Sequence, residues 1–408
     1  MRRYQAIIAA LVVLAGVAAS GLVGAPSGAA PSAAGRPTPT AAPPPVTCAS
    51  VAEVQAWPLA RQVGHLVMVG VPILQSTRSA AAVAQFGLAG ILIRGTPGPD
   101  TAKRIGAIRA AGLPGTPPIV AVDEEGGRVQ HLKRAVGAVP SAAVMGATSN
   151  PEQVRALAAK HARGMRALGF TMDLGPVVDL ANGDGNGIGD RAWSTDPTVT
   201  SQFGLAFARG LMDGGIVPVL KHFPGHGHAS GDSHDVGATT PPIDVLRQSD
   251  LLPFRDGATV AGIGVMVAHL QVPGLDTLPA SLSPAAVNGV LRTELHHRGL
   301  VITDSLSMWP IRFHFPAPRA AELALKAGND ILLFDDEPDV AAIVSALVNV
   351  VTAEPELHAQ VTAANLRILA AVGRPTCAPD VAALDLPATI APTAPTTTPP
   401  TTGASTGG

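Results

Sequence analysis

Eight short apolar segments limit this sequence to a small set of folds. They are residues 63–71, 87–94, 117–123, 171–180, 217–222, 265–270, 300–304 and 330–334. Each segment is continuously apolar rather than alternating, which is typical of parallel strands that are covered on both faces. Stretches with helical periodicity separate most of them. We therefore expect an α/β fold in which strands and helices alternate along the chain.

Helix-end signals support the same arrangement. Asn150 and Asp196 each precede a proline, which predicts an N-cap followed by Pro at the first helical position, and Gly169 and Gly328 predict helix ends. Eight strands with seven or more helices predict a (β/α)8 TIM barrel. A doubly wound open sheet is the alternative, but no glycine-rich dinucleotide-binding fingerprint supports it.

The terminal segments differ in composition from the patterned part of the chain. Residues 1–24 have the pattern of a secretory signal peptide, with two arginines followed by a small-residue apolar stretch. Residues 25–47 form an Ala/Pro-rich linker and residues 387–408 a Pro/Thr-rich tail, both predicted to be disordered. Residues 48–380 are 333 of the 408 residues of a chain that is 47% hydrophobic, and we expect them to fold as a single domain.

The N-terminal pattern also bears on location and redox state. An uncleaved membrane anchor is the alternative to a cleaved signal, but the Ala and Gly content makes the stretch weakly hydrophobic, so cleavage is favoured. We expect a secreted or cell-wall-associated protein. Cys48 and Cys377 are the only cysteines and bracket the patterned sequence. In an exported protein they predict one disulfide, with two unrelated thiols as the alternative.

Charge and aromatic content restrict the partners. The formal net charge is −2 and no basic stripe is present, so a nucleic-acid partner is not expected. Aromatic residues make up 3% of the chain, which argues against a long surface for stacking a polysaccharide. We expect a monomer that acts on a small ligand.

Polar residues cluster where the predicted strands end. Asp123 ends the third segment and is followed by polar residues up to Arg128. The ends of the next four segments carry Asp179, Lys221 and His222, His269, and Asp304, while Asn329 and Asp330 open the eighth. In a TIM barrel the C-terminal strand ends face the active site. Five segments that deliver charged or imidazole groups to one rim predict an enzyme.

Residues 221–236, with the sequence KHFPGHGHASGDSHDV, hold four histidines and two aspartates among glycines. Three interpretations are open. A zinc site could use His226, His228, Asp232 and His234, but their spacing matches none of the common zinc signatures. Histidines bonded only to backbone groups are a second interpretation, which is weak for four in one glycine-rich loop. In the third, Asp232 fixes the tautomer of His234 and raises its basicity.

Two further aspartates are candidates for function. Asp123 can accept two hydrogen bonds from ligand hydroxyl groups, whereas Glu124, Glu125 and Arg128 could form a solvated ion cluster of little energetic value, with Arg128 mainly structural. Asp304 follows a buried strand, which suits a nucleophile because the strand fixes its position. Aspartate also ends strands as a turn residue.

Seven motifs together carry a family resemblance. DEEGGRVQ, GDRAWSTDP, KHFPGHG, DSH, LPASLSP, ITDSLSM and AGND occur in this order. Over about residues 55–375 the chain resembles the bacterial single-domain β-N-acetylglucosaminidases of glycoside hydrolase family 3. The resemblance implies a TIM barrel in which Asp304 is the nucleophile that forms a covalent glycosyl-enzyme and His234, paired with Asp232, is the acid/base. The residues implied to bind the terminal N-acetylglucosamine are Asp123, Arg191, Lys221 and His222.

The chain departs from the family pattern in places. Glu124 replaces the usual Gln, His131 stands where an Arg commonly follows the motif, Ser305 replaces a second acid, and the histidine-rich loop is longer. The resemblance implies a cofactor-free and metal-free exo-hydrolase that retains configuration and acts on peptidoglycan fragments. A phosphorylase is an alternative, because a neutral imidazole repels phosphate less than a carboxylate would. A wall-associated sugar-binding protein without activity is another.

Overall fold

The computed structural model describes residues 48–182, 187–231, 237–336 and 338–384. The predicted signal peptide, linker and tail lie outside these residues, as do Asp232 and His234, so the boundaries predicted for the segments stay predictions. Within the described ranges, no helix is long and apolar enough to cross a membrane.

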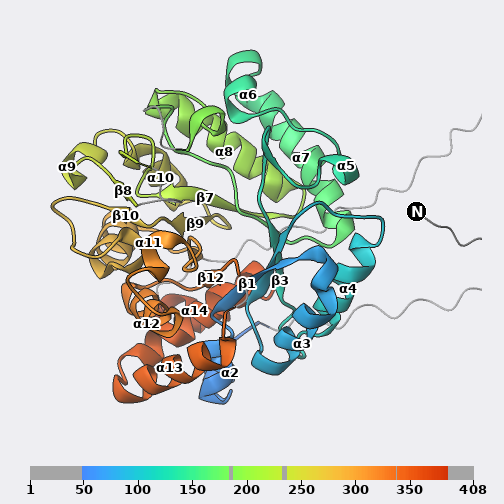
Figure 1. Ribbon diagram of the computed structural model, residues 1–408, viewed down its shortest axis with the longest axis vertical. Coiled ribbons are helices and arrows are strands. Elements are labelled where there is room, and N and C mark those ends of the chain that lie inside the picture. Colours follow the sequence, from blue (N-terminus) through green and yellow to red (C-terminus); the bar gives the residue numbers. More distant parts are fainter. Residues whose placement is uncertain (1–47, 183–186, 232–236, 337, 385–408) are drawn as a thin grey trace, which may run out of the picture. The chain divides into compact units, whose positions relative to one another are not determined.

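Eight parallel strands form the centre of the fold (Figure 1). They are β1 (Val67–Pro72), β2 (Gly90–Arg94), β3 (Ile119–Val122), β6 (Met172–Asp173), β7 (Val217–Phe223), β9 (Gly264–Val267), β11 (Val301–Thr303) and β12 (Leu332–Phe334). Their order in the sheet is β11-β9-β7-β6-β3-β2-β1-β12. The first and last strands of this order meet through a parallel bridge between Ile302 and Ile331, which closes the sheet into a barrel. The predicted (β/α)8 TIM barrel is confirmed.

Helices connect the strands and surround the barrel. The α-helices are α1 (Val51–Gln55), α2 (Leu59–Gly64), α3 (Ser76–Phe86), α4 (Thr101–Ala110), α5 (Lys133–Val136), α6 (Ala142–Thr148), α7 (Pro151–Leu168), α8 (Pro197–Asp213), α9 (Ile243–Leu246), α10 (Leu251–Ala258), α11 (Trp309–Arg312), α12 (Ala317–Ala327), α13 (Val340–Ala353), α14 (Leu357–Ala371) and α15 (Ala378–Leu384). Three short 3-10 segments, η1 (Ile73–Gln75), η2 (Gly189–Arg191) and η3 (Ala280–Leu282), and a π-helix, η4 (Ala285–Glu294), complete the helical elements.

The predicted helix ends are confirmed by their geometry. The Asn150 side chain accepts a hydrogen bond from Gln153 N, and the Gln153 side chain accepts one from Asn150 N, so α7 begins with a capping box. Asp196 caps α8, with its side chain accepting hydrogen bonds from Thr198 N and Val199 N. Gly169 and Gly328 follow α7 and α12 with φ values of 100° and 108°, a left-handed conformation that glycine adopts without steric cost.

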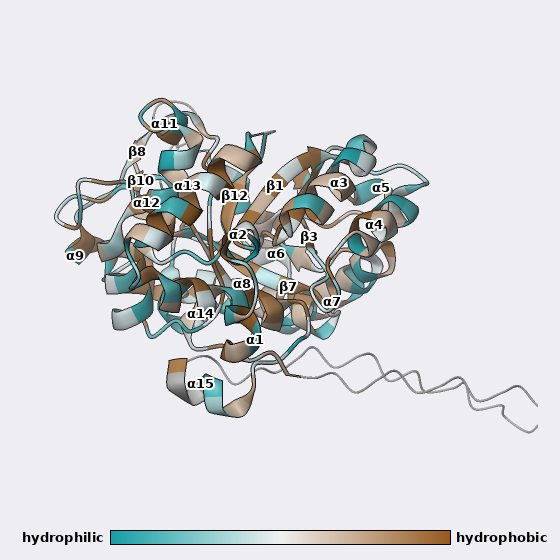
Figure 2. Ribbon diagram, turned by 90° about the horizontal axis from the view of Figure 1, so that it is seen from below, coloured by the Kyte–Doolittle hydropathy of each residue, from teal (hydrophilic) through white to brown (hydrophobic). Residues whose placement is uncertain are grey.

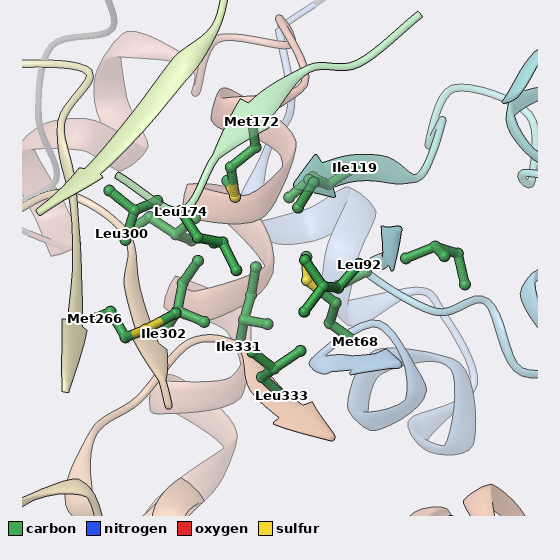
Figure 3. Close-up of a cluster of buried hydrophobic side chains, with 14 of the residues drawn as sticks. Met68, Leu92, Ile119, Met172, Leu174, Met266, Leu300, Ile302, Ile331 and Leu333 are labelled. Carbon is green, nitrogen blue, oxygen red and sulfur yellow. The ribbon is translucent and has the colours of Figure 1, made fainter. Parts of the chain in front are cut away.

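Apolar side chains fill the interior of the barrel (Figure 3). They come from strands all round the sheet and from residues beside them: Met68, Leu92, Ile119, Met172, Leu174, Met266, Leu300, Ile302, Ile331 and Leu333. All are buried, so the barrel is a packed core and not a pore. A ligand must therefore bind at one end of the barrel rather than inside it.

Two predicted strands have different boundaries in the structure. The segment 63–71 begins inside α2, and only residues from Val67 onward form β1. The segment 171–180 pairs with its neighbours over two residues, because Pro176 has no N–H to donate to the sheet. An isolated bridge between Val177 and Lys221 continues the pairing beyond this proline.

Two pairs of short strands lie outside the barrel in the part of the chain that the structure describes. The antiparallel pair β4 (Glu124–Gly126) and β5 (Val129–Gln130) forms a hairpin directly after β3. The strands β8 (Ala238–Thr239) and β10 (Leu270–Gln271) pair in parallel. Sequence analysis predicted none of these short strands, which are too brief to have a recognisable pattern.

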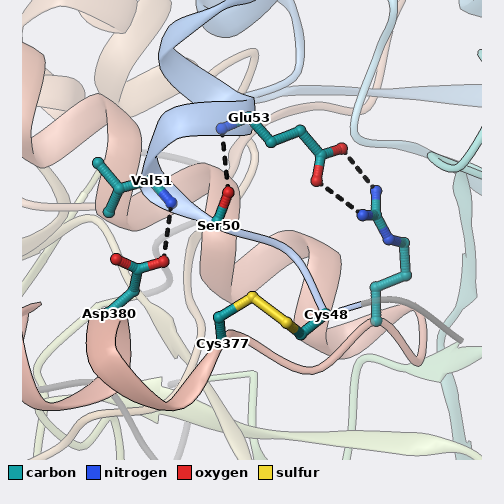
Figure 4. Close-up of a disulfide and its surroundings, with 7 residues drawn as sticks. Cys48, Ser50, Val51, Glu53, Cys377 and Asp380 are labelled. Carbon is teal, nitrogen blue, oxygen red and sulfur yellow. Dashed lines mark hydrogen bonds and ion pairs between the residues drawn. A yellow bond between two sulfur atoms is a disulfide. The ribbon is translucent and has the colours of Figure 1, made fainter.

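A disulfide joins the two ends of the described domain (Figure 4). The sulfur atoms of Cys48 and Cys377 are bonded, as predicted. The neighbouring residues Ala49 and Thr376 form a parallel bridge, and α1 packs on α14. Arg374 also donates two hydrogen bonds to the Glu53 carboxylate, at 2.8 and 2.9 Å. Val51 N of α1 donates to Asp380 Oδ2 of α15 at 3.0 Å, so the first helix is held against both of the last two helices.

Candidate active site

The residues predicted to bind substrate come together at the C-terminal rim of the barrel. Asp123 directly follows β3, and Lys221 and His222 lie in the last part of β7. Arg191 ends the 3-10 segment η2 in the connection between β6 and α8. Asp304 directly follows β11. Strand ends position four of these five side chains, which is why a parallel barrel can assemble them from distant parts of the sequence.

Lys221 and Arg191 are held by two carboxylates. The Lys221 Nζ atom lies 2.7 Å from Asp123 Oδ1 and 2.7 Å from Glu125 Oε1. Arg191 donates to both oxygens of Glu125, from Nε at 2.7 Å and from Nη2 at 2.8 Å. The side chains of Lys221, Arg191 and Glu125 are 3%, 10% and 5% exposed, so their positions are fixed before any ligand binds.

Burial and charge together set the protonation of this network. Burial alone would raise the pKa of Glu125, but the cations Lys221 and Arg191 outweigh it and lower the pKa to about 2. Burial opposes the charged form of Lys221 too, yet Asp123 and Glu125 raise its pKa above the usual value, and Glu125 similarly raises the pKa of Arg191. All three groups therefore stay charged at neutral pH and can offer fixed charges to a polar ligand.

His222 is oriented by a buried carboxylate. Its Nδ1 atom lies 2.6 Å from Asp179 Oδ2, and Asp179 also accepts a hydrogen bond from the main-chain N of His226 at 2.7 Å. Burial would raise the pKa of Asp179, but His222 and these hydrogen bonds lower it. The Nε2 atom of His222 lies 3.4 Å from Arg191 Nη2, which can only donate, so Nδ1 carries the proton and donates to Asp179.

Asp304 is anchored by the strand that it follows and by the turn after it. Its main-chain N donates to Val267 O at 2.8 Å, and its Oδ1 accepts from Ser305 N at 2.7 Å. Asp304 is partly exposed, as is Asp123.

Ser305, which replaces the second acid of the family motif, supports this turn. Its hydroxyl donates to Asp335 Oδ1 at 2.6 Å, and His269 contacts its carbonyl oxygen through Nε2 at 2.7 Å. His269 is buried, with Nδ1 bonded to Ser281. The sequence pattern groups His269 with the polar residues of the rim, whereas in the structure it supports the turn that follows Asp304.

Glu124 and Glu125 are buried, so the interpretation of residues 124–128 as a solvated ion cluster is wrong for both. Glu124 Oε2 accepts hydrogen bonds from the main-chain N atoms of His131 and Leu132, and Oε1 lies 2.9 Å from His161 Nε2. Glu124 thereby ties the hairpin β4–β5 to α7. Arg128, by contrast, pairs at the surface with Asp190 and donates to the carbonyl of Gly187, as its structural assignment predicted.

Glu125 is the residue of this site that sequence analysis missed. Its burial depends on Arg191 and Lys221, which are distant in sequence, and no local pattern indicates it. A second buried acid, Asp173, lies below the rim and accepts a hydrogen bond from Glu124 N at 3.0 Å. Burial, followed by the negative charge of Glu124, raises the pKa of Asp173 well above its usual value.

The remaining histidines of the glycine-rich loop have separate partners. His228 contacts Asp250 through Nδ1 at 2.7 Å, while His226 is buried beside His222. Among the described residues, no three His, Cys, Asp or Glu side chains are placed to hold a metal ion together. The proposed partners Asp232 and His234 lie outside the described ranges, so their pairing stays a prediction.

Fixed charges at the C-terminal rim of a TIM barrel, beside a carboxylate that ends a strand, define a barrel enzyme that binds a polar ligand. Residues 59–371 match the model of the glycosyl hydrolase family 3 N terminal domain. The chain therefore belongs to glycoside hydrolase family 3, as its motifs predicted. It is a glycoside hydrolase, and its substrate is a carbohydrate.

Known relatives agree with this family membership. The chain is 42% identical over 360 residues to β-hexosaminidase LpqI of Mycobacterium tuberculosis, covering 85% of this chain and 90% of the relative. The solved structure of a family 3 glycosyl hydrolase from Mycobacterium smegmatis is 41% identical, with a TM-score of 0.73 over 78% of this chain and 98% of that one. The β-N-acetylhexosaminidase of Beutenbergia cavernae is 28% identical, with a TM-score of 0.72 over 78% and 99% of the two chains.

Proposed function

We propose that this glycoside hydrolase is an exo-acting β-hexosaminidase that removes terminal β-linked N-acetylglucosamine with retention of configuration. The observation that carries the proposal is the rim itself, where Asp304 ends β11 on the same side of the barrel as the network of Asp123, Lys221 and Arg191. The 42% identity to a β-hexosaminidase over most of the chain supports the same activity.

The fixed charges suit a sugar with several hydroxyl groups. Asp123 keeps one oxygen on Lys221 and has a side chain that is 29% exposed, so its carboxylate can accept hydrogen bonds from sugar hydroxyls. Arg191 and His222 are held by Glu125 and Asp179 and can present N–H and ring nitrogen atoms in set directions. Because these groups are already ordered, binding a sugar costs little side-chain entropy.

In the proposed reaction Asp304 attacks the anomeric carbon while His234, as the imidazolium, donates its proton to the glycosidic oxygen. The bond to the leaving group breaks and a covalent glycosyl-enzyme forms on Asp304. His234, now neutral and oriented by Asp232, then takes a proton from water, which attacks the same carbon and releases Asp304. Two inversions at this carbon give retention.

The setting of the reaction is part of the proposal. The signal-like N-terminus supports export, and a single predicted domain with few aromatic residues suits small glycans. We propose that the enzyme works as a monomer outside the cytoplasmic membrane or associated with the wall. Its substrates there are GlcNAc-terminated fragments of peptidoglycan.

The test measures release of nitrophenol from p-nitrophenyl β-N-acetylglucosaminide by the wild type and by Asp304→Asn. We expect the variant to lose activity by at least about a thousandfold, because the covalent route is closed. The matched control is Asp213→Asn, an exposed aspartate that pairs with Arg155, and it should keep full activity. A 5-fluoro-N-acetylglucosaminyl donor should add its sugar mass to the peptide that contains Asp304.

Two outcomes would replace the proposal. Release that requires phosphate, with a sugar 1-phosphate as product, would make the enzyme a phosphorylase. No release, with N-acetylglucosamine binding intact, would make the protein a sugar-binding one. Release that persists in Asp304→Asn would remove the nucleophile from the mechanism.

A further inference from the structure

A cavity lined largely by polar side chains lies away from the candidate active site. It has a volume of about 240 Å³ and is lined by side chains of η4 and α14 together with Arg298 and Gly328. Asp330 and Val301, at the N-terminal ends of β12 and β11, are bonded to each other just beside it. Figure 2 shows α14 and α15 at the end of the barrel opposite to α11, the helix that follows Asp304. The cavity is thus on the face that the reaction does not use.

Positive charge predominates at this cavity. Arg292 Nη2 and Arg367 Nη1 donate to different oxygens of Asp330, at 2.7 and 2.8 Å. This trio of two guanidinium groups and one carboxylate has a net charge of +1. Arg298 adds a third guanidinium, whose Nη1 donates to the carbonyl of Arg292 at 2.8 Å.

One of the arginines at this cavity, Arg367, also keeps an unused hydrogen-bond donor. In the part of the chain that the structure describes, Arg367 Nε is buried without a hydrogen-bond partner. Burial, and then the charge of Arg367, lowers the pKa of Arg292 to about 10, so the two cations disfavour each other. A buried donor without a partner and two cations that share one carboxylate are features that a bound anion would relieve.

The side-chain amide of Asn288 is a further donor at the cavity, and Gly328 leaves room for it. A Cβ atom at this glycine would lie 2.2 Å from Asn288 Oδ1, so the absence of a side chain makes room for the Asn288 amide. Asn288 lines the cavity together with Arg367 of α14. An amide beside guanidinium groups is a combination that suits oxygen acceptors carrying negative charge.

We propose that this cavity binds an oxyanion of the phosphate type, either free inorganic phosphate or the phosphate group of a monoester. Its arginines can form paired N–H···O bonds with the tetrahedral oxygens, and Asn288 supplies a neutral donor. Because the lining comes from η4, Arg298 and α14, the bound anion links three separate segments and stabilises the folded state. The anion takes no part in glycoside hydrolysis.

The test compares thermal unfolding of the full chain in phosphate with unfolding in sodium chloride at equal ionic strength. Phosphate at about ten times its dissociation constant should raise Tm by about 2 °C, since it binds the folded state only. The dissociation constant is measured separately by calorimetry with inorganic phosphate and with glycerol 2-phosphate. Binding of both identifies a site for a terminal phosphate group, and binding of inorganic phosphate alone identifies a site for the free ion.

Asn288→Asp is the decisive variant, because it places a carboxylate in the cavity. Phosphate affinity should fall at least tenfold while nitrophenol release is unchanged. Arg298→Gln gives a second readout if Asn288→Asp does not fold, and Arg247→Gln, a surface arginine that pairs with Glu294, is the matched control. An equal rise of Tm in wild type and both cavity variants, or no binding by calorimetry, would overturn the proposal. If phosphate raises Tm but no sugar 1-phosphate is produced, phosphate binds at this cavity and does not act as a substrate at the rim.

Discussion

The ionised Glu125 carboxylate makes the unfolding free energy of the protein depend on pH, and the variant Glu125→Gln measures the size of its contribution. The pKa of this carboxyl is lowered from 4.5 to about 2, which corresponds to about 3 kcal/mol of stabilisation at neutral pH, since one pKa unit equals about 1.4 kcal/mol. Glutamine has nearly the same size but no charge. It therefore removes the counter-charge of Arg191 and one of the two partners of Lys221 without opening a cavity.

The sign of the pH dependence follows from the lowered pKa. The stabilisation is complete above pH 4.5, where the carboxyl is ionised in both the folded and unfolded chains, and it is lost as the pH falls toward 2. We expect Glu125→Gln to be less stable than the wild type by about 3 kcal/mol at pH 7 and by about 1.4 kcal/mol at pH 3. The variant should also lose kcat/KM, because Arg191 is no longer held.

Urea unfolding followed by tryptophan fluorescence at pH 7 and pH 3 measures both differences. Glu356→Gln, the same change at an exposed residue, is the control and should unfold like the wild type at both values. A stability loss below 1 kcal/mol at pH 7, or a difference that stays constant between the two pH values, would refute the assignment of Glu125 as the central counter-charge.

Three other changes test the scaffold. The double variant Cys48→Ser/Cys377→Ser should unfold more easily by up to about 5 kcal/mol in urea, because the disulfide closes a loop of 329 residues; an equal loss in reduced wild type is the check. Burial lowers the pKa of His65 to about 4, so the unfolded chain takes up a proton at this ring before the folded one does, and the wild type should lose about 3 kcal/mol of unfolding free energy between pH 6.5 and 4. His65→Gln should remove this pH-dependent loss of stability. Asn150→Ala should lower the unfolding free energy by about 1 kcal/mol through loss of the α7 cap, and an unchanged urea midpoint would contradict the capping role.

The arrangement of strands could be predicted because parallel strands are buried on both faces. Continuous apolar segments mark all eight barrel strands, and helix caps such as Asn150 mark where the chain turns back. The boundaries of the strands were harder to predict from the sequence. The apolar residues of 63–66 suit a buried helix end as well as a strand, and periodicity cannot separate the two over so short a run.

Position in the barrel indicated the residues of the candidate site that lie at strand ends, whereas Arg191, in the 3-10 segment η2, was indicated only by the family resemblance. Asp123, Lys221, His222 and Asp304 each lie at such an end, so position in the barrel indicated them. Glu125 was missed because a buried acid is unusual, and the cations that make its burial favourable are 66 and 96 residues away along the chain. Long-range charge pairing of this kind leaves no periodic signal in the sequence.

The disulfide and the α1–α14 contact bring both ends of the described domain to one face of the barrel. Figure 2 shows α1 and α15 at the end opposite to α11. A tether would therefore join the described domain at the end of the barrel opposite to the rim that carries Asp304. Fixed to a surface by either end, the enzyme would turn its rim toward the surrounding medium. A single cut in a loop between Cys48 and Cys377 would still leave one covalently joined molecule.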